Sequence, residues 1–146
     1  MTYENVEILF AEDSIDDATL TIRALKKSGL SNKLLHVKDG AEALDFMYAR
    51  GEYASRNTAV NPKLLVLDLK MPKVSGMQVL EKIKSDPAFR AIPVVILTSS
   101  KEDPDIAKCY ALGANSYIVK PVGSENFFAA IKEMGIYWLV LSEPTQ

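Results

Sequence analysis

The chain has 146 residues, of which 48% are hydrophobic and 25% charged, and its formal net charge is −2. These values are typical of one globular domain, exclude a disordered chain, and give no electrostatic reason to expect nucleic acid or an anionic membrane as a partner. The single cysteine, Cys109, cannot form an intramolecular disulfide, and no apolar stretch approaches the ~20 residues of a membrane span. The amino terminus also lacks a signal-peptide pattern, so we expect a cytoplasmic domain.

The first part of the chain predicts a strand, a helix and a second strand. Residues 6–11 form an apolar run typical of a buried strand. Ser14 then has the position of a helix N-cap, with Asp17 three residues on as its capping partner, and Gly29 ends the helix. Residues 34–37 predict a short second strand.

The middle of the chain predicts two more helices and two more strands. Asp39-Gly40 indicates a turn before the second helix. The polar composition of residues 48–62 predicts that the latter part of this stretch is a surface loop. Residues 64–67 predict the third strand, and the third helix stops at Asp86-Pro87 because proline disfavours a helical residue before it. Residues 93–97 predict the fourth strand.

The last part of the chain predicts a helix, a strand and a final helix. Asp103-Pro104 opens the fourth helix and Gly113 ends it. Residues 117–119 predict the fifth strand, and Ser124 caps the last helix. Only residues 121–146 follow Lys120, and the last helix uses most of them, so we expect a single domain over 1–146 with no output domain.

The regular alternation of strands and helices predicts an α/β fold. Strands joined by helices form parallel sheets with right-handed crossovers. We therefore expect a doubly wound, five-stranded parallel sheet with strand order 2-1-3-4-5. His36 lies in the predicted second strand, away from the acidic edge described next, and we expect a structural role for it.

Residues suited to phosphate chemistry stand where four of these strands end. They are Glu12 and Asp13, Asp68, Thr98, and Lys120. The carboxyl ends of parallel strands meet at one edge of a sheet, where ligands of such folds bind. Three crowded carboxylates repel one another, which favours a divalent cation, and oxygen ligands suit Mg²⁺.

The same residues suit transfer of a phosphoryl group. Asp68 is the best candidate for the nucleophile, which would form an aspartyl phosphate. Thr98 could donate a hydroxyl, and Lys120 an ammonium, to the oxygens of the transferred group.

These motifs together resemble the response-regulator receiver domains of two-component signalling. The match includes Glu12-Asp13, Asp68 with Met71-Pro72 and Gly76 after it, Thr98-Ser99-Ser100, Gly113-Ala114, and Tyr117 ahead of Lys120-Pro121. The resemblance implies a flavodoxin-like receiver fold in which Asp68 accepts a phosphoryl group from a sensor histidine kinase.

The resemblance also implies roles for the other site residues. Asp13, Asp68 and the backbone carbonyl of Lys70 would hold Mg²⁺, and Glu12 would help through water. Thr98 and Tyr117 would form the switch that couples phosphorylation to a surface change. The Lys120-Pro121 peptide would be cis.

A narrower resemblance concerns residues 46–53 and 137–139. Both segments are similar to the single-domain response regulators that pair with cyanobacterial and bacterial phytochromes, which implies a phytochrome-type kinase as partner. Lys70 departs from those relatives, which often have asparagine there. Because this position lies beside the phosphoryl group, the departure bears on the lifetime of the aspartyl phosphate.

The last helix has more apolar residues than one buried face can use. The surplus includes Phe128, Tyr137, Trp138 and Val140. Such a surplus usually marks a partner site, and twofold pairing is the commonest way to bury it. We expect a homodimer through the face of the fourth helix, fifth strand and fifth helix. A heteromeric partner, or a tail that folds back on its own domain, are the rival interpretations.

Other functions compete with a phosphorylation-controlled signalling protein. A phosphatase with Asp68 as nucleophile would usually have a second acid two residues on, where this chain has Lys70. A nucleotide-binding domain would have a glycine-rich loop after the first strand, where Glu12-Asp13-Ser14 stands. A degenerate receiver scaffold would not need the complete acidic site. We therefore expect no enzyme beyond catalysis of its own phosphorylation and dephosphorylation.

Overall fold

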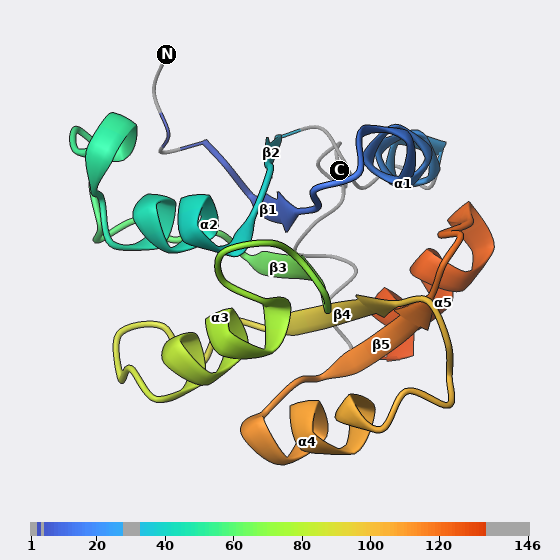
Figure 1. Ribbon diagram of the computed structural model, residues 1–146. Helices are drawn as coiled ribbons and strands as arrows, with labels where there is room; N and C mark the ends of the chain where they lie inside the picture. Colours follow the sequence, from blue (N-terminus) through green and yellow to red (C-terminus); the bar gives the residue numbers. More distant parts are fainter. Residues whose placement is uncertain (1–2, 4, 28–32, 134–146) are drawn as a thin grey trace.

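The computed structural model describes residues 3, 5–27 and 33–133, which form one sheet with helices on both faces (Figure 1). The elements are β1 (Ile8–Ala11), α1 (Ile15–Lys27), β2 (Leu34–Val37), α2 (Gly40–Met47), a 3-10 turn η1 (Gly51–Tyr53), β3 (Leu64–Asp68), α3 (Gly76–Lys84), β4 (Val94–Thr98), α4 (Asp105–Leu112), β5 (Ser116–Val119) and α5 (Ser124–Glu133). All neighbouring strands are parallel and their order is β2-β1-β3-β4-β5. The predicted fold class and strand order are confirmed.

Two apolar cores cover the two faces of the sheet. Successive side chains of a strand point to opposite faces, so Leu9 and Leu65 join the core under α2, α3 and α4. Phe10 and Val66 join the core under α1 and α5. Figure 1 shows these two helix layers on either side of the sheet. Leu65 is fully buried, and complete burial of one such side chain contributes about 1.5–3 kcal/mol.

The functional strand ends belong to the sheet itself. The third and fourth strands each extend one residue beyond their predicted ends, so that Asp68 and Thr98 are the last residues of β3 and β4. Asp68 lies in register with Leu97, and Thr98 with Val119. Their backbones are therefore fixed by strand pairing, and their side chains start from rigid positions.

The helix starts agree with the sequence in part. Ser14 caps α1 as predicted, because its Oγ accepts a hydrogen bond of 3.2 Å from the amide of Asp17. Asp17 is thus the capping partner of Ser14 through its backbone amide, while its carboxylate bonds to Lys120. Asp39 is the N-cap of α2, which begins at Gly40, rather than part of a separate turn. The residue Gly29 lies outside the described residues.

Gly113 ends α4 as predicted. Its φ of 114° lies in the left-handed region that favours glycine, and its amide donates to Tyr110. None of the helices within the described part of the chain is long and apolar enough to cross a membrane.

The long connection between α2 and β3 is fastened by one buried arginine. The guanidinium of Arg56 donates from Nε to the carbonyl of Phe46 (2.6 Å) and from Nη2 to that of Met47 (3.0 Å), both in the last turn of α2. Its Nη1 donates to the carbonyls of Asn57 and Val60, and its Nη2 also donates to Asn61 Oδ1. All five N–H groups of Arg56 are thus paired, and the predicted surface loop is an ordered segment.

Candidate functional site

The three predicted acidic residues meet at the carboxyl edge of the sheet. One carboxylate oxygen each from Glu12, Asp13 and Asp68 lies within 4.8 Å of the others. Glu12 and Asp68 are buried, whereas Asp13 is exposed at the mouth of the cluster. Three carboxylates on two adjacent strands form a donor set of the kind that hard divalent cations prefer, so these residues fit the metal that the sequence predicts.

A glycine allows the following loop to lie against the acidic site. A Cβ atom placed on Gly76 would stand 2.1 Å from the carbonyl oxygen of Asp68, so no other residue fits without a shift of the backbone. The amide of Gly76 donates to the carbonyl of Leu69 at 3.1 Å. The start of α3 therefore packs directly on the end of β3 and helps to fix Asp68.

Lys120 binds three carboxylates from three different elements. Its Nζ lies 3.0 Å from Glu12 Oε1, 3.0 Å from Asp17 Oδ2 and 3.2 Å from Asp68 Oδ1. Burial would lower the pKa of Lys120, but its hydrogen bonds to Glu12 and Asp17 and the charges of Asp68 and Glu12 outweigh burial and raise it. Lys120 is therefore a fixed positive charge beside the candidate nucleophile.

The sequence reasoning missed the contact between Asp17 and Lys120. Its signal was the presence of an acid four residues after Asp13, in the first turn of a helix that begins at the same sheet edge. The peptide bond between Lys120 and Pro121 is cis, as the resemblance implies.

The carboxyl of Asp68 has an unusual proton affinity. Burial raises the pKa of Asp68 to about 7, the hydrogen bond and negative charge of Glu12 act in the same direction, and Lys120 opposes them. A carboxyl group must be ionised to act as a nucleophile. A divalent cation at this cluster would therefore favour the reactive form.

A small pocket opens beside Asp68. Its volume is about 100 Å³, comparable to about three water molecules, which is room for a phosphoryl group. Asp68, Leu69, Lys70, Thr98, Ser99, Asp103 and Lys120 line it. The buried hydroxyl of Thr98 donates to the carbonyl of Ser100 at 3.2 Å, so it lies at the pocket with a bond that can be exchanged. The exposed Lys70 side chain lies 3.5 Å from Asp103 across the mouth.

Tyr117 and His36 differ in their relation to this site. The half-buried ring of Tyr117 lies on β5 next to Ile96 of β4, and its centroid is 6.1 Å from that of Tyr110 on α4, outside the pocket lining. His36 is closer than predicted, since its Nε2 lies 2.7 Å from the backbone carbonyl oxygen of Glu12. The prediction that His36 lies away from the acidic edge is wrong, and the residue braces β2 against the end of β1.

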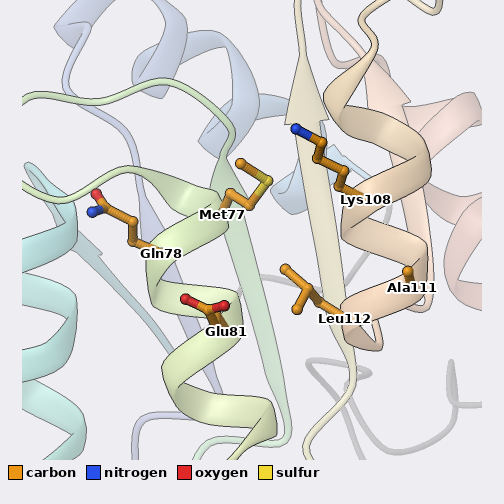
Figure 2. A pocket seen from close by; sticks show the side chains of 6 residues that line it. All are labelled: Met77, Gln78, Glu81, Lys108, Ala111 and Leu112. Atoms are coloured by element: carbon orange, nitrogen blue, oxygen red, sulfur yellow. The ribbon is translucent and has the colours of Figure 1, made fainter.

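A second, larger hollow lies between α3 and α4 (Figure 2). Its volume is about 340 Å³ and it is lined by Met77, Gln78, Glu81, Lys108, Ala111 and Leu112. Figure 2 shows the side chains of Met77 and Leu112 extending between the two helices. The hollow shares no residue with the acidic pocket and has only one carboxylate in its lining, so the phosphoryl chemistry belongs to the strand ends.

Of the predicted dimer residues, the structure describes only Phe128, which is half-buried in α5. Tyr137, Trp138 and Val140 lie outside the described residues.

Comparisons with known proteins agree with this geometry. The model of the response regulator receiver domain matches residues 8–132. The chain belongs to the response regulator receiver family. It is therefore a signalling protein of two-component systems, in which receiver domains take phosphoryl groups from histidine kinases.

Three relatives cover most of the chain. The solved bacteriophytochrome response regulator RtBRR is 48% identical with a TM-score of 0.85, over 94% of this chain and 82% of its own. The response regulator Rcp1 of Synechocystis sp. is 36% identical over 132 residues, which are 90% of this chain and 88% of Rcp1. Its solved Mn²⁺-bound form has a TM-score of 0.73 and 34% identity, and covers 95% of this chain and 98% of its own. The probable methanogenesis regulatory protein FilR2 of Methanothrix harundinacea is 38% identical over 90% of this chain and 83% of its own.

Proposed function

We propose that this protein takes a phosphoryl group from the phosphohistidine of a sensor kinase onto Asp68. The observation that carries this proposal is the position of the Asp68 carboxylate between the acidic pair and the Lys120 ammonium, at a pocket of phosphoryl size. A carboxylate oxygen of Asp68 forms the new P–O bond as the P–N bond of the phosphohistidine breaks. The bonding electron pair stays with the imidazole nitrogen, and a proton on the other ring nitrogen of the phosphohistidine makes the departing imidazole neutral.

Mg²⁺ is the cofactor we propose for this step. Asp13, Asp68 and the backbone carbonyl of Lys70 would hold it, with Glu12 acting through water. Bound there, the ion would neutralise charge on the transferred group. The Mn²⁺-bound form of the relative Rcp1 supports a divalent metal for this chain as well.

Lys120 and Thr98 bind the transferred group after the step. The Lys120 ammonium already lies 3.2 Å from Asp68, so it can donate a charge-assisted hydrogen bond to a phosphoryl oxygen. The Thr98 hydroxyl turns from Ser100 to a second phosphoryl oxygen. Tyr117 then turns inward and reports the change to the surface of α4, β5 and α5.

The partner kinase we propose is of the phytochrome type, and the signalling takes place in the cytoplasm. The identity with RtBRR, named for a bacteriophytochrome, and the similarity of residues 46–53 support this choice. The relative FilR2 is instead named as a probable methanogenesis regulatory protein. Phosphotransfer from a panel of purified, autophosphorylated histidine kinases tests it, and preference for a kinase without a phytochrome module would exclude it.

The output we propose is a homodimer through the α4-β5-α5 face. The ring pair of Tyr110 and Tyr117 lies on this face, and the sequence has further surplus apolar residues at Tyr137 and Val140. Sedimentation of the parent protein and of a Tyr137→Glu, Val140→Glu variant tests the dimer. A parent that stays monomeric at micromolar concentration in both phosphorylation states would exclude it.

Incubation with Mg²⁺ and acetyl phosphate, followed by intact mass measurement, tests the phosphoacceptor function. We expect the protein to gain one phosphoryl group and to keep it long enough to be weighed. A phosphatase would instead release phosphate over many turnovers without accumulating the adduct. A scaffold would show neither result.

A further inference from the structure

The Lys120 ammonium already has three carboxylate partners, hydrogen-bonded to Glu12 and Asp17 and in an ion pair with Asp68. An ammonium has three N–H donors, and three carboxylates lie within 3.2 Å of the Lys120 nitrogen. A phosphoryl group on Asp68 brings further anionic oxygens to Lys120, and these compete with its carboxylate partners for the ammonium. The bond that breaks determines the free-energy cost of the switch and the element of the fold whose contacts change.

The three carboxylates differ in their access to water. The side chains of Glu12 and Asp68 are 0% and 7% exposed, whereas that of Asp17 is 42% exposed. A buried carboxylate that loses its partner is costly because nothing replaces the lost hydrogen bond, but an exposed one is rehydrated at once. Asp68 keeps Lys120 through the phosphoryl group that it then carries, so the choice lies between Glu12 and Asp17, and the bond to Asp17 is the less costly of these two to break.

We propose that Asp17 holds Lys120 in the unphosphorylated protein and releases it when a phosphoryl group on Asp68 binds the ammonium. Asp17 is then a positioning residue that competes with the phosphoryl group for Lys120. The inference rests on the proposed function, since it names the regulation of the same site. It also ties the state of the site to the first turn of α1, where Asp17 stands.

The test compares Asp17→Asn with Asp16→Asn. Asp16 lies in the same first turn of α1 and is exposed, so its substitution removes the same charge from the same helix end without touching Lys120. Titration with beryllofluoride in the presence of Mg²⁺ measures the binding of a phosphoryl mimic to Asp68 at equilibrium. We expect Asp17→Asn to bind it about two- to five-fold more tightly than the parent, which is the range of one partly exposed ion pair. Asp16→Asn should bind it like the parent.

A second measurement separates competition from a structural effect. In a Lys120→Ala background, Asp17→Asn should change beryllofluoride affinity less than two-fold, because the ammonium for which the Asp17 carboxylate competes is absent. If Lys120→Ala binds too weakly for titration, the rate of amine acetylation of Lys120, read by peptide mass against the other lysines, decides instead. We expect about two- to five-fold faster labelling in Asp17→Asn and no change in Asp16→Asn.

Several results would overturn the inference. They are equal affinities of Asp17→Asn and the parent, weaker binding by Asp17→Asn, or an equal effect of the Asp16 substitution. Failure of the parent to gain a phosphoryl group from acetyl phosphate would count against the proposed function instead. A parent that is phosphorylated while Asp17→Asn behaves identically would reject only the role of Asp17.

Discussion

Lys120 and Arg56 are both largely buried cations, but their partners differ in kind. Arg56 donates all five of its N–H groups to neutral oxygens, four backbone carbonyls and one side-chain amide. Within the described residues no carboxylate forms an ion pair with Arg56. Lys120 instead has three carboxylate partners, and a fourth carboxylate, that of Asp13, lies beside them.

The difference separates a finished cluster, in which every donor of the cation has a neutral acceptor, from an unfinished one, in which negative charge is left over. The planar guanidinium of Arg56 matches its five acceptors, so none of its N–H groups remains for a ligand. The carboxylates around Lys120 carry more negative charge than one ammonium neutralises, and a pocket opens beside them. A metal ion and a phosphoryl group would complete this second cluster. A buried cation with neutral partners therefore indicates a structural residue that fixes the chain, here called a fastener. A buried cation with surplus carboxylates indicates a binding site.

The largest effect on phosphoryl chemistry is expected from Asp68→Asn. The amide keeps the shape of the side chain and removes the nucleophile, so incorporation of a phosphoryl group from acetyl phosphate should fall to zero by intact mass. The free energy of unfolding should not fall, because the substitution removes repulsion between Asp68 and the buried Glu12. Phosphoryl incorporation that persists in this variant would show that the acceptor lies elsewhere.

The pH dependence of stability gives a second test of the unfinished cluster. Burial raises the pKa of Asp68 to about 7, so between about pH 4 and pH 7 the folded protein holds a proton that the unfolded chain releases. The contribution of Asp68 to the free energy of unfolding therefore decreases as pH rises through this window. We expect this slope in urea titrations of the parent in chelator, and its loss in Asp68→Asn. Parallel slopes of the two proteins would contradict the raised pKa.

A smaller effect is expected when the metal ligands are removed one at a time. Asp13 is exposed and free to bind the ion directly, whereas the Glu12 carboxylate already accepts from Lys120 and from the amide of Ser14. Asp13→Ala should therefore weaken Mn²⁺ or Mg²⁺ binding about ten-fold or more, and Glu12→Ala less. Equal losses in the two variants, or phosphorylation undiminished in excess chelator, would refute this ligand scheme.

The sheet and the strand-end residues were predictable because both depend on local pattern. Apolar runs such as 64–67 have no polar face, which indicates burial on both sides, and strand order places their ends at one edge. The contact of His36 with Glu12 was not predictable, and that of Asp17 with Lys120 had only the position of Asp17 at the start of the first helix as a signal. Each depends on how far a side chain from one element reaches into the next, which spacing along the chain does not encode.

Arg56 shows the same limit more strongly. It stands in a polar segment between a helix and a strand, where an arginine is usually solvated. Its burial follows from the last turn of α2, where the carbonyl of Met47 accepts from the guanidinium and that of Phe46 accepts from it as well as from the amide of Ala49. Only the folded path of residues 48–63 brings the side chain to them.

Lys120→Ala should affect phosphoryl chemistry in part. Asp13 and Asp68 remain, so metal binding should persist, but the contact that the ammonium makes after transfer is lost. We expect Asp68 to be phosphorylated while the amide signals of Thr98 and Tyr117 in ¹H–¹⁵N spectra shift much less than in the parent. If phosphorylation shifts these signals equally in both proteins, Lys120 is not part of the switch.

Arg56→Ala should have no effect on phosphoryl chemistry and a clear effect on stability. The substitution removes five hydrogen bonds, and the carbonyls of Phe46 and Met47 lose the guanidinium as their donor. We expect this to lower the free energy of unfolding by about 2–4 kcal/mol. Arg56→Lys keeps the charge but has three donors without the planar fork, so it should recover less than half of this loss. Arg50→Ala is the matched control, because its exposed ion pair with Asp45 at 3.5 Å is worth only about 0–0.5 kcal/mol. Urea unfolding measures the stability, and acetyl phosphate labelling of the folded variants measures the chemistry. If Arg56→Ala lowered the rate of phosphorylation as well, the two buried cations would be coupled, and their division into fastener and site would fail.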